Sequence, residues 1–316
     1  MATPINLSES ESQFFQDLVP PESFNIKKIQ MEEFTKRHSL LKNRVVLITS
    51  GGTTVPLESR TVRFIDNFSI GTRGATSAEY FLKQGYAVLF LHRHRSLQPF
   101  FQRVEKNILD ILSVSENDPT VITGEISYPS LAKSLAPVVK DYHKYKNEGM
   151  LSMVEFTTLT EYLILLRAAS EAMQACGREG MVYLAAAVAD FYVPRGLMPE
   201  HKIQSSEGAL KLTLEMTPKM LKPLVKEWSP NAFVISFKLE TDQSLLIEKS
   251  RNALLVYQHQ MVIANILETR KKEVFIVTMD AEEILRLSDE ELAAGREIEE
   301  PLIDKLVEHH TTLLLS

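Results

Sequence analysis

The stretch DNFSIGTRG at residues 66–74 is rich in small residues whose backbone a ligand can approach closely. Gly71 and Gly74 stand directly before a segment in which apolar residues repeat at helical spacing as far as Gly85. The unpaired N–H groups and the dipole of a helix N-terminus both favour anions. The stretch therefore predicts a phosphate-binding turn. A tight turn that only packs a helix onto a sheet is the alternative.

Other residues that could do chemistry follow apolar runs, in the stretches SGGT, AVADF, SFKLET and ANILE. The backbone at Gly51 could join that of the glycine-rich stretch in cradling a nucleotide. Asn67 could hydrogen-bond an acyl group without adding charge, and Asp190 could hold a hydroxyl or an amide N–H. Lys202, in PEHKIQSS, could bring a mobile cation to a phosphate. Such a set suits the activation of a carboxylate by a nucleotide, although each residue alone could be a turn former, an N-cap or part of a loop.

Elements that would position these residues follow from the apolar pattern. Short β-branched or apolar runs predict buried strands, at Arg44–Ser50, Tyr86–His92, Val182–Val188, Ala232–Lys238, Met261–Ala264 and Val274–Thr278. Helical patterns lie between them, at 71–84, 130–147, 158–177, 218–228, 244–258 and in the C-terminal segment. A strand, a helix and a second strand in succession imply a parallel pair. The chain is therefore expected to form a doubly wound, mostly parallel α/β sheet, with ligands beyond the carboxyl ends of its strands.

Three regions fit this plan less directly. Residues 1–40 are expected to be a polar lead-in with one or two helices, and residues 41–316 a single α/β domain. Within that domain, residues of about 94–150 are less regular and suggest an insertion over one sheet edge. Lys211–Glu215 alternates in polarity and predicts an exposed strand.

Composition limits the functional class. Of the 316 residues 44% are hydrophobic, and the net charge of −6 gives the chain no electrostatic footprint for nucleic acid. No apolar run is long enough for a membrane span, and the polar, acidic start does not resemble a secretory signal. Cys176 is the single cysteine, so the chain can form no internal disulfide, which fits a reducing compartment such as the cytoplasm. Cys176 itself is expected to be structural. No motif with metal-ligand spacing suggests zinc.

A nicotinamide-dependent oxidoreductase of the Rossmann type is the main rival interpretation. It would need GxGxxG in a short turn after the first strand, whereas here the long loop GGTTVPLESRTVRFIDNFS intervenes. Loops of that length inside a compact domain are usually functional. The second strand ends in HRHR, which could suit a 2′-phosphate or form a solvated rim. No P-loop or GxSxG motif is present. A non-catalytic scaffold would leave the polar residues at the strand ends unexplained.

Several stretches together resemble phosphopantothenoylcysteine synthetase in its stand-alone eukaryotic form. They are TSGGTTVPLESRTVRFIDNFSIGTRGATSAE, VEFTTLTEYL, YLAAAVADFYVP, MPEHKIQSS, VISFKLETD and IANILETR. The resemblance covers the chain from about Arg44 to its end and depends on the order and number of the stretches. It implies a ligase of coenzyme A biosynthesis that joins 4′-phosphopantothenate to L-cysteine through an acyl-nucleotidylate and releases pyrophosphate. It also implies ATP, with CTP possible, as co-substrate, Mg²⁺, and a homodimer.

The resemblance also assigns site residues one by one. Those similar to nucleotide contacts are Gly51, Ser69, Gly71, Gly74, Phe237 and Asn265. Those similar to phosphopantothenate contacts are Asn67, Ala186, Ala187 and Asp190. Arg63 is similar to a phosphate anchor donated by the second subunit. Lys202 matches the first lysine of a bacterial Lys-Ile-Lys-Lys motif that reads KIQS here, so the catalytic roles fall to Lys202 and Asn67.

Overall fold

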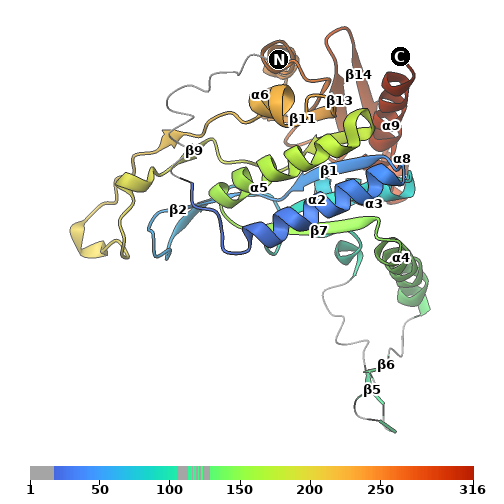
Figure 1. Ribbon diagram of the computed structural model, residues 1–316, viewed down its shortest axis with the longest axis horizontal. Helices are drawn as coiled ribbons and strands as arrows, with labels where there is room; N and C mark the ends of the chain where they lie inside the picture. The colour runs from blue at the N-terminus through green and yellow to red at the C-terminus, as the bar shows by residue number, and fades with distance from the viewer. Residues whose placement is uncertain (1–17, 105–112, 116, 119, 121, 124–128) are drawn as a thin grey trace.

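The structure is a computed structural model that describes residues 18–104, 113–115, 117, 118, 120, 122, 123 and 129–316. An eight-stranded sheet forms its centre, with helices on both faces (Figure 1). In spatial order the strands are β14 (Glu282–Arg286), β13 (Glu273–Val277), β12 (Met261–Ile266), β11 (Phe233–Glu240), β8 (Gly180–Leu184), β1 (Val45–Ser50), β4 (Ala87–Arg93) and β7 (Leu151–Phe156). Every residue of β1 is buried, as expected for a strand covered on both faces.

The connectivity of the sheet confirms the doubly wound fold. From β7 across to β12 all neighbouring strands are parallel, whereas β13 and β14 add an antiparallel edge. The chain builds β1, β4 and β7 outward in one direction and β8, β11 and β12 in the other. The reversal falls between β1 and β8. In sheets of this kind the crevice at the reversal is where ligands bind.

Helices cover the sheet through two large apolar clusters and one small one. Helices α2 (Phe24–Leu40) and α5 (Leu159–Ala172) pack in one large cluster, and α3 (Thr72–Lys83), α4 (Pro129–Asn147) and α9 (Glu299–Leu315) in the other. The small cluster joins α7 (Leu246–Tyr257) to β12 and β13. Helix α8 (Asp289–Ala293) precedes α9. Helix α5 begins with the capping box of Thr158 and Glu161 that the sequence indicated.

The structure describes parts of two regions that the sequence left less certain, residues 1–40 and about 94–150. Helix α4 lies between β4 and β7 in the chain and these strands pair in parallel, so β4, α4 and β7 form a βαβ unit of the sheet. Helix α2 contacts α5, and its Met31 and Phe34 side chains are buried in the core. The division of the chain near residue 40, and the extent of an insertion within 94–150, remain proposals.

Three sequence-based boundaries were wrong. The strand expected at Val182–Val188 ends at Leu184, because the chain then turns to bond with the loop after β1. Of the strand expected at Lys211–Glu215, only Glu215 is extended, in a two-residue β10 (Glu215–Met216) that pairs with β9 (Phe191–Tyr192).

The helix expected at Pro218–Trp228 is the third of these errors. Only Leu221–Pro223 is α-helical, as α6, and a π-helical turn, η6 (Leu224–Trp228), follows. Pro223 has no N–H to give to an α-helical bond. Short 3₁₀ turns complete the chain, at η1 (Phe101–Arg103), η3 (Met173–Glu179), η4 (Arg195–Leu197), η5 (Ser205–Glu207) and η7 (Gln243–Leu245).

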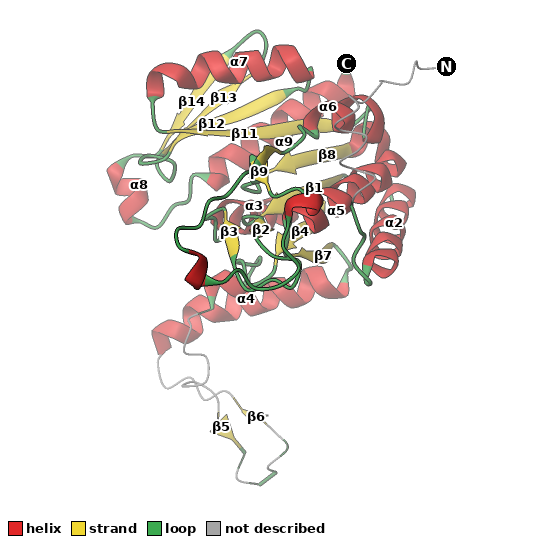
Figure 2. Ribbon diagram, turned by 90° about the vertical axis from the view of Figure 1, so that its left-hand side faces the viewer, coloured by secondary structure: helices red, strands yellow, loops and turns green. Residues whose placement is uncertain are grey.

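Small hairpins lie outside the main sheet. The long loop between β1 and α3 folds as a hairpin of β2 (Thr54–Pro56) and β3 (Phe64–Asp66). A second pair, β5 (Ser113–Val114) and β6 (Ile122–Thr123), lies beyond α4 (Figure 2). The segment between β9 and β10 extends away from the sheet and is called here the arm, residues 193–214 (Figure 1). No helix in the described part of the chain is long and apolar enough to cross a membrane.

Candidate active site at the reversal point of the sheet

The first part of the candidate site is the close packing of helix α3 on the end of β1. Gly71 is the N-cap of α3 and has a left-handed conformation, with φ of 87°. Its carbonyl accepts a hydrogen bond of 3.1 Å from Ser50 Oγ. A Cβ on Gly74 would lie only 2.4 Å from Ser50 Oγ, so a larger residue there would force Ser50 to shift. The N-terminus of α3 is therefore held at the carboxyl end of the central strand, as a phosphate-binding turn requires.

The second part is the main chain around Asn67. Gly52 touches it so closely that a Cβ would lie 1.8 Å from the Asn67 carbonyl oxygen. The Asn67 N–H donates to the Thr53 carbonyl at 3.2 Å. Asn67 is half-buried, and its position is set by main-chain contacts. Ser69 lines a neighbouring cavity of about 640 Å³, together with Arg93, Ser96 and the start of α5.

The third part is the loop after β8, which is joined to the loop after β1. The Ala187 N–H donates to the Gly51 carbonyl at 2.8 Å, and the Ala187 carbonyl accepts from the Thr53 N–H at 3.1 Å. The Ala186 N–H donates to Thr49 Oγ1 at 3.2 Å. These bonds cross the reversal point of the sheet. They place the two alanines beside Gly51 and the glycine-rich stretch.

The loop after β8 continues along a smaller cavity of about 290 Å³, lined by Ala186, Asp190, Thr217, Phe237 and others. Asp190 is exposed and pairs with Lys219 at 2.6 Å. Phe237 packs edge-on against Tyr183 with ring centroids 4.9 Å apart. This cavity therefore brings together residues that the sequence assigned to different ligands.

Asn265 lies at the end of β12 and is almost fully buried, with 5% of its surface exposed. Its Oδ1 accepts a bond of 3.2 Å from Arg73 Nη2, and its Nδ2 donates to the Lys238 carbonyl at 3.1 Å. Arg73 belongs to the first turn of α3, between the two glycines. Asn265 is thus linked directly to the glycine-rich stretch.

Arg63, on the hairpin, makes both of its side-chain contacts within this chain. Its Nη1 bonds to Glu58 Oε1 at 2.9 Å and to the Ile203 carbonyl at 3.1 Å. The Glu58 side chain is fully buried. Hydrogen bonds from the backbone and side chain of Arg63 and from the Val62 and Ile203 N–H groups lower the pKa of Glu58 to about 2. The guanidinium is thereby fixed beside the arm, and it carries further N–H donors.

Lys202 is not close-packed with the glycine turns. It is exposed on the arm and lines a third cavity, of about 630 Å³, with Leu57 of the hairpin and Lys211 of the arm. Its neighbour Ile203 is bonded to Arg63 and Glu58. The arm therefore connects to the site through the hairpin.

Cys176 is buried, and burial raises the pKa of its thiol to about 12, which fits the expected structural role. Among the described residues, no group of three or more His, Cys, Asp or Glu side chains could hold a metal. Mg²⁺ in nucleotide sites commonly takes its ligands from substrate phosphates and water, so a preformed protein cage is not required.

Sequence reasoning missed several residues at the site. Arg73 and Glu299 meet across 226 positions of sequence, and no local pattern indicates such a pair. Thr217 and Lys219 lie in an irregular segment, although a helix was expected to begin at residue 218. The only available signal was the place of Arg73 between Gly71 and Gly74, which the sequence assigns to a phosphate-binding turn.

Comparison with known proteins identifies relatives of this chain. Residues 153–307 match the family described as DNA/pantothenate metabolism flavoprotein C-terminal domain. The Homo sapiens phosphopantothenate–cysteine ligase is 51% identical over 90% of this chain and 92% of its own length. The Saccharomyces cerevisiae ligase CAB2 is 39% identical over 97% of this chain and 87% of its own length.

A solved structure has the same fold. A Cab2 mutant in complex with phosphopantothenate-cysteine superposes with a TM-score of 0.86 at 39% identity, covering 96% of this chain and 99% of that one. The superposition covers nearly the whole of this chain. The chain therefore belongs to the family of phosphopantothenate–cysteine ligases.

Proposed function

We propose that this protein joins 4′-phosphopantothenate to L-cysteine at the expense of a nucleoside triphosphate, as a ligase of coenzyme A biosynthesis. The observation that carries the proposal is the family membership, 51% identity over 90% of the chain to a ligase of that name. The local geometry agrees with it. A glycine turn at a helix N-terminus and the half-buried Asn67 lie at the end of β1, and the buried Asn265 of β12 bonds to Arg73 within that turn.

The chemistry explains why a nucleotide is needed. An amine cannot displace oxide from a carboxylate, so the carboxylate first attacks the α-phosphorus of the nucleotide and pyrophosphate leaves. The acyl-nucleotidylate that forms carries a good leaving group. The cysteine amine then attacks the acyl carbon, loses a proton and displaces the nucleoside monophosphate.

The nucleotide side of the site is proposed to be the face of α3. The backbone at Gly51, Gly71 and Gly74, with Ser69, would hold the phosphates against the positive end of the helix. Phe237, in the middle of β11, and Asn265, near the end of β12, would contact the rest of the nucleotide. ATP is the expected co-substrate, with CTP as the alternative. Mg²⁺ would offset the charge of the triphosphate.

The acyl side of the site is proposed to be the loop after β8. The small side chains of Ala186 and Ala187 leave room for the pantothenate chain, and Asp190 would bond its polar groups. Asn67 would hydrogen-bond the acyl group at the point of attack. Lys202, carried by the arm, would stabilise the negative charge that grows on the α-phosphate.

Assembly and compartment complete the proposal. Arg63 would bind the phosphate of phosphopantothenate in the site of a second subunit, so that the active form is a homodimer. The exposed apolar side chains of Val62 and Phe64 beside it, 56% and 52% exposed, suit a surface that a second subunit covers. The reaction is expected to take place in the cytoplasm.

The test is a pyrophosphate assay. The protein is incubated with phosphopantothenate, cysteine and Mg²⁺, with either ATP or CTP. We expect pyrophosphate release that depends on phosphopantothenate and is faster with ATP. A protein that releases none with either nucleotide, and instead changes the absorbance of NAD(P)H, would be an oxidoreductase.

A further inference from the structure

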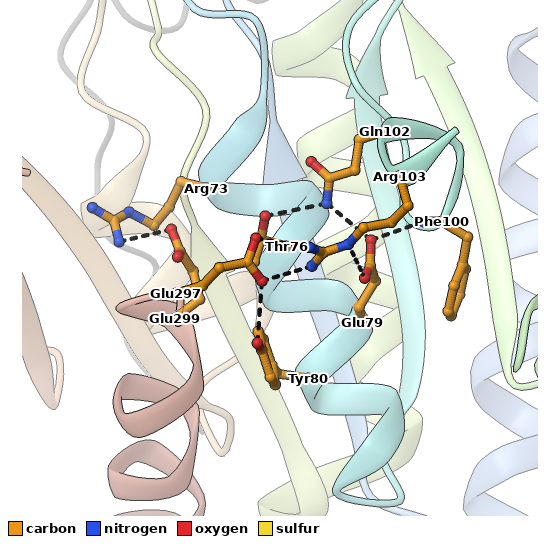
Figure 3. Close-up of polar contacts among 9 residues, drawn as sticks. All are labelled: Arg73, Thr76, Glu79, Tyr80, Phe100, Gln102, Arg103, Glu297 and Glu299. Carbon is orange, nitrogen blue, oxygen red and sulfur yellow. Dashed lines mark hydrogen bonds and ion pairs between the residues drawn. The ribbon is translucent and has the colours of Figure 1, made fainter. Parts of the chain in front are cut away.

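Arg73 connects three elements that meet beside the proposed nucleotide site. It extends from the first turn of α3 and bonds to Glu299 Oε1, at the start of α9, at 2.9 Å (Figure 3). Its Nη2 bonds to Asn265 Oδ1 at 3.2 Å and to the Arg270 carbonyl at 2.6 Å. The Arg73 and Glu299 side chains are only 17% and 11% exposed. The contact is therefore largely removed from water.

These contacts leave Arg73 poorly suited to bind a phosphate itself. Glu299 neutralises the guanidinium, and both terminal nitrogens already donate to protein oxygens. Glu299 in turn stands at a helix N-terminus, where a carboxylate is favoured. Burial raises the pKa of Glu299, and the positive charge of Arg73 partly opposes that rise. The ion pair of Arg73 and Glu299 therefore holds the Arg73 side chain in one position.

The Arg73 side chain, held in this way, fixes the orientation of the Asn265 carboxamide. The amide NH₂ of Asn265 faces the Lys238 carbonyl, and the amide oxygen faces the Arg73 guanidinium. Turning the amide over would bring two oxygens together on one side and two donors together on the other. In a side chain that is 5% exposed, such mispaired groups are costly. Asn265 is therefore restricted to one orientation, with one amide N–H left over for a ligand.

We propose that Arg73 is a positioning residue of the nucleotide site: it fixes Asn265 so that the amide presents an N–H donor to an acceptor atom of the nucleotide. This inference rests on the proposed nucleotide-dependent ligation. It assigns a function to a residue that would not touch either substrate. It also explains why an arginine occupies the position between Gly71 and Gly74, where side chains must leave the phosphate-binding face open.

The same region offers a matched control in Arg103. Arg103 bonds to Glu79 Oε2 at 2.8 Å and to Glu297 at 2.9 and 2.7 Å (Figure 3). It therefore ties α3 to the segment before α9 through a comparable ion pair. None of its described contacts reaches Asn265. Loss of Arg103 should weaken the packing of α3 without changing the amide of Asn265.

The experiment is a double-mutant cycle. Arg73→Gln and Arg103→Gln are made in the wild-type and in the Asn265→Ala background. For each, kcat, the KM for ATP and phosphopantothenate, and equilibrium binding of ATP are measured. Arg73→Gln should raise the KM and Kd for ATP by about three- to tenfold, which is the effect expected from losing one hydrogen bond. The KM for phosphopantothenate should change by less than about twofold, and Arg73→Gln should have no further effect on ATP binding when Asn265 is already Ala.

Other outcomes would overturn the inference. If Arg73→Gln weakens ATP binding by the same factor in both backgrounds, Arg73 does not act through Asn265. If Arg103→Gln weakens ATP binding as much as Arg73→Gln, the effect is one of packing. Arg73→Lys keeps the charge beside Glu299 and serves as a control for misfolding of the Gln variant. It should retain the wild-type Tm within about 3 °C yet still weaken ATP binding, because an ammonium cannot make the forked contacts. Full ATP affinity in a folded Arg73→Lys protein would contradict the proposal.

The two proposals fail in different ways. If the wild-type protein binds ATP but releases no pyrophosphate with phosphopantothenate and cysteine, the proposed ligation is wrong. The ATP-binding measurements on the variants would still decide the role of Arg73. If the wild type is active and the cycle shows no coupling between Arg73 and Asn265, only the positioning inference is wrong.

Discussion

At the scale of single residues, Asn67 has a fixed backbone and a side chain that can be changed without rebuilding the fold. Its carbonyl oxygen lies against Gly52 and its N–H bonds to Thr53. Asn67→Asp alters only the charge of this side chain, which is proposed to lie beside the acyl phosphate. Two like charges about 4 Å apart at an effective dielectric near 20 repel by roughly 4 kcal/mol. We expect kcat/KM to fall by up to about three decades, measured by pyrophosphate release.

The control for this prediction is Asn252→Asp, the same change at an exposed position of α7. It should leave kcat/KM unchanged within about twofold, and both variants should keep the wild-type thermal unfolding midpoint within a few degrees. An Asn67→Asp protein with activity within about threefold of wild type would remove Asn67 from the site.

Lys202 gives a second residue-scale prediction. It is exposed on the arm, where no core packing requires an ammonium. Lys202→Gln keeps polarity and removes the charge that is proposed to follow the α-phosphate. Losing such a contact typically lowers kcat by about 10²–10³. We expect that loss in single-turnover formation of the acyl-nucleotidylate, with ATP affinity nearly unchanged.

Lys211 provides the comparison, because it is also exposed and lines the same cavity as Lys202. Lys211→Gln should leave the single-turnover rate within about twofold of wild type. Equal rate losses in the two variants would indicate a general effect of arm charge, and a normal rate in Lys202→Gln would end the catalytic assignment.

We expect His259 to contribute to the pH dependence of stability. It is 3% exposed, its Nε2 lies 2.8 Å from Ser236 Oγ, and burial lowers its pKa to about 4. Between the unfolded pKa near 6.5 and this folded value, only the unfolded chain binds the proton, so stability falls as the pH falls. The His259 contribution should drop by about 2 kcal/mol between about pH 7.5 and pH 5.

Urea unfolding at both pH values checks this. The wild type should lose about 2 kcal/mol more than His259→Asn does, and the exposed His143→Asn should behave as the wild type. The pKa values of His38, His92 and His310 are lowered for the same reason, burial, so the variant should retain some acid sensitivity. Identical pH profiles for wild type and His259→Asn would show that this imidazole titrates normally.

At the scale of elements, the site depends on the hairpin between β1 and α3 lying directly on the end of β1. Gly52 is the point of contact, since its added Cβ would lie 1.8 Å from Asn67 O, a backbone atom. Gly52→Ala must therefore move the Asn67 segment. Overpacking of this kind costs about 1–3 kcal/mol. A displacement of about 1 Å at a reacting group can lower the rate by about 10²-fold.

Gly196→Ala is the matched substitution, because nothing lies within 4 Å of its added Cβ. Thermal unfolding and pyrophosphate release are compared for the two proteins. We expect Gly52→Ala to be impaired in both measurements and Gly196→Ala to behave as wild type. A fully active Gly52→Ala enzyme would mean that Asn67 need not be held where the structure places it.

Elements with a strong local signal could be predicted from the sequence. The β1 run VVLITS is buried throughout and read clearly as a strand, and the capping box fixed the start of α5. Strand β7, LSMVEF, was missed because it is an edge strand with partly exposed, polar positions. The hairpin strands β2 and β3 are three residues each and carry no periodicity to detect.

The site could be predicted only as far as its residues belong to contiguous motifs. Gly71 and Gly74 were identified because a glycine turn before a helix has a local physical meaning. The pairing of Asn265 with Arg73 joins positions 192 apart, and the pairing of Asp190 with Lys219 depends on how an irregular segment folds back. Such contacts are set by the topology of the sheet, which local patterns do not encode.

At the scale of the whole molecule, the doubly wound sheet explains why residues from distant parts of the chain share one edge. Parallel strands end at the same side, and the reversal between β1 and β8 opens the crevice there. The hairpin and the arm extend from that edge. They are joined to each other by the contacts of Arg63 and Glu58 with Ile203. An assembly that covers the hairpin would therefore also affect the arm that carries Lys202.

Arg63 allows the assembly to be tested by mixing inactive variants. If Arg63 serves the site of the other subunit, a hybrid of Arg63→Ala and Asn67→Asp chains has one site with both defects and one with neither. With random exchange about half of the dimers are hybrids, so mixing two nearly inactive proteins should restore about a quarter of wild-type activity. Exchange itself is measured by co-purification of differently tagged chains. If exchange occurs and the mixture is no more active than its components, Arg63 acts within its own subunit, where it already bonds to Glu58 at 2.9 Å.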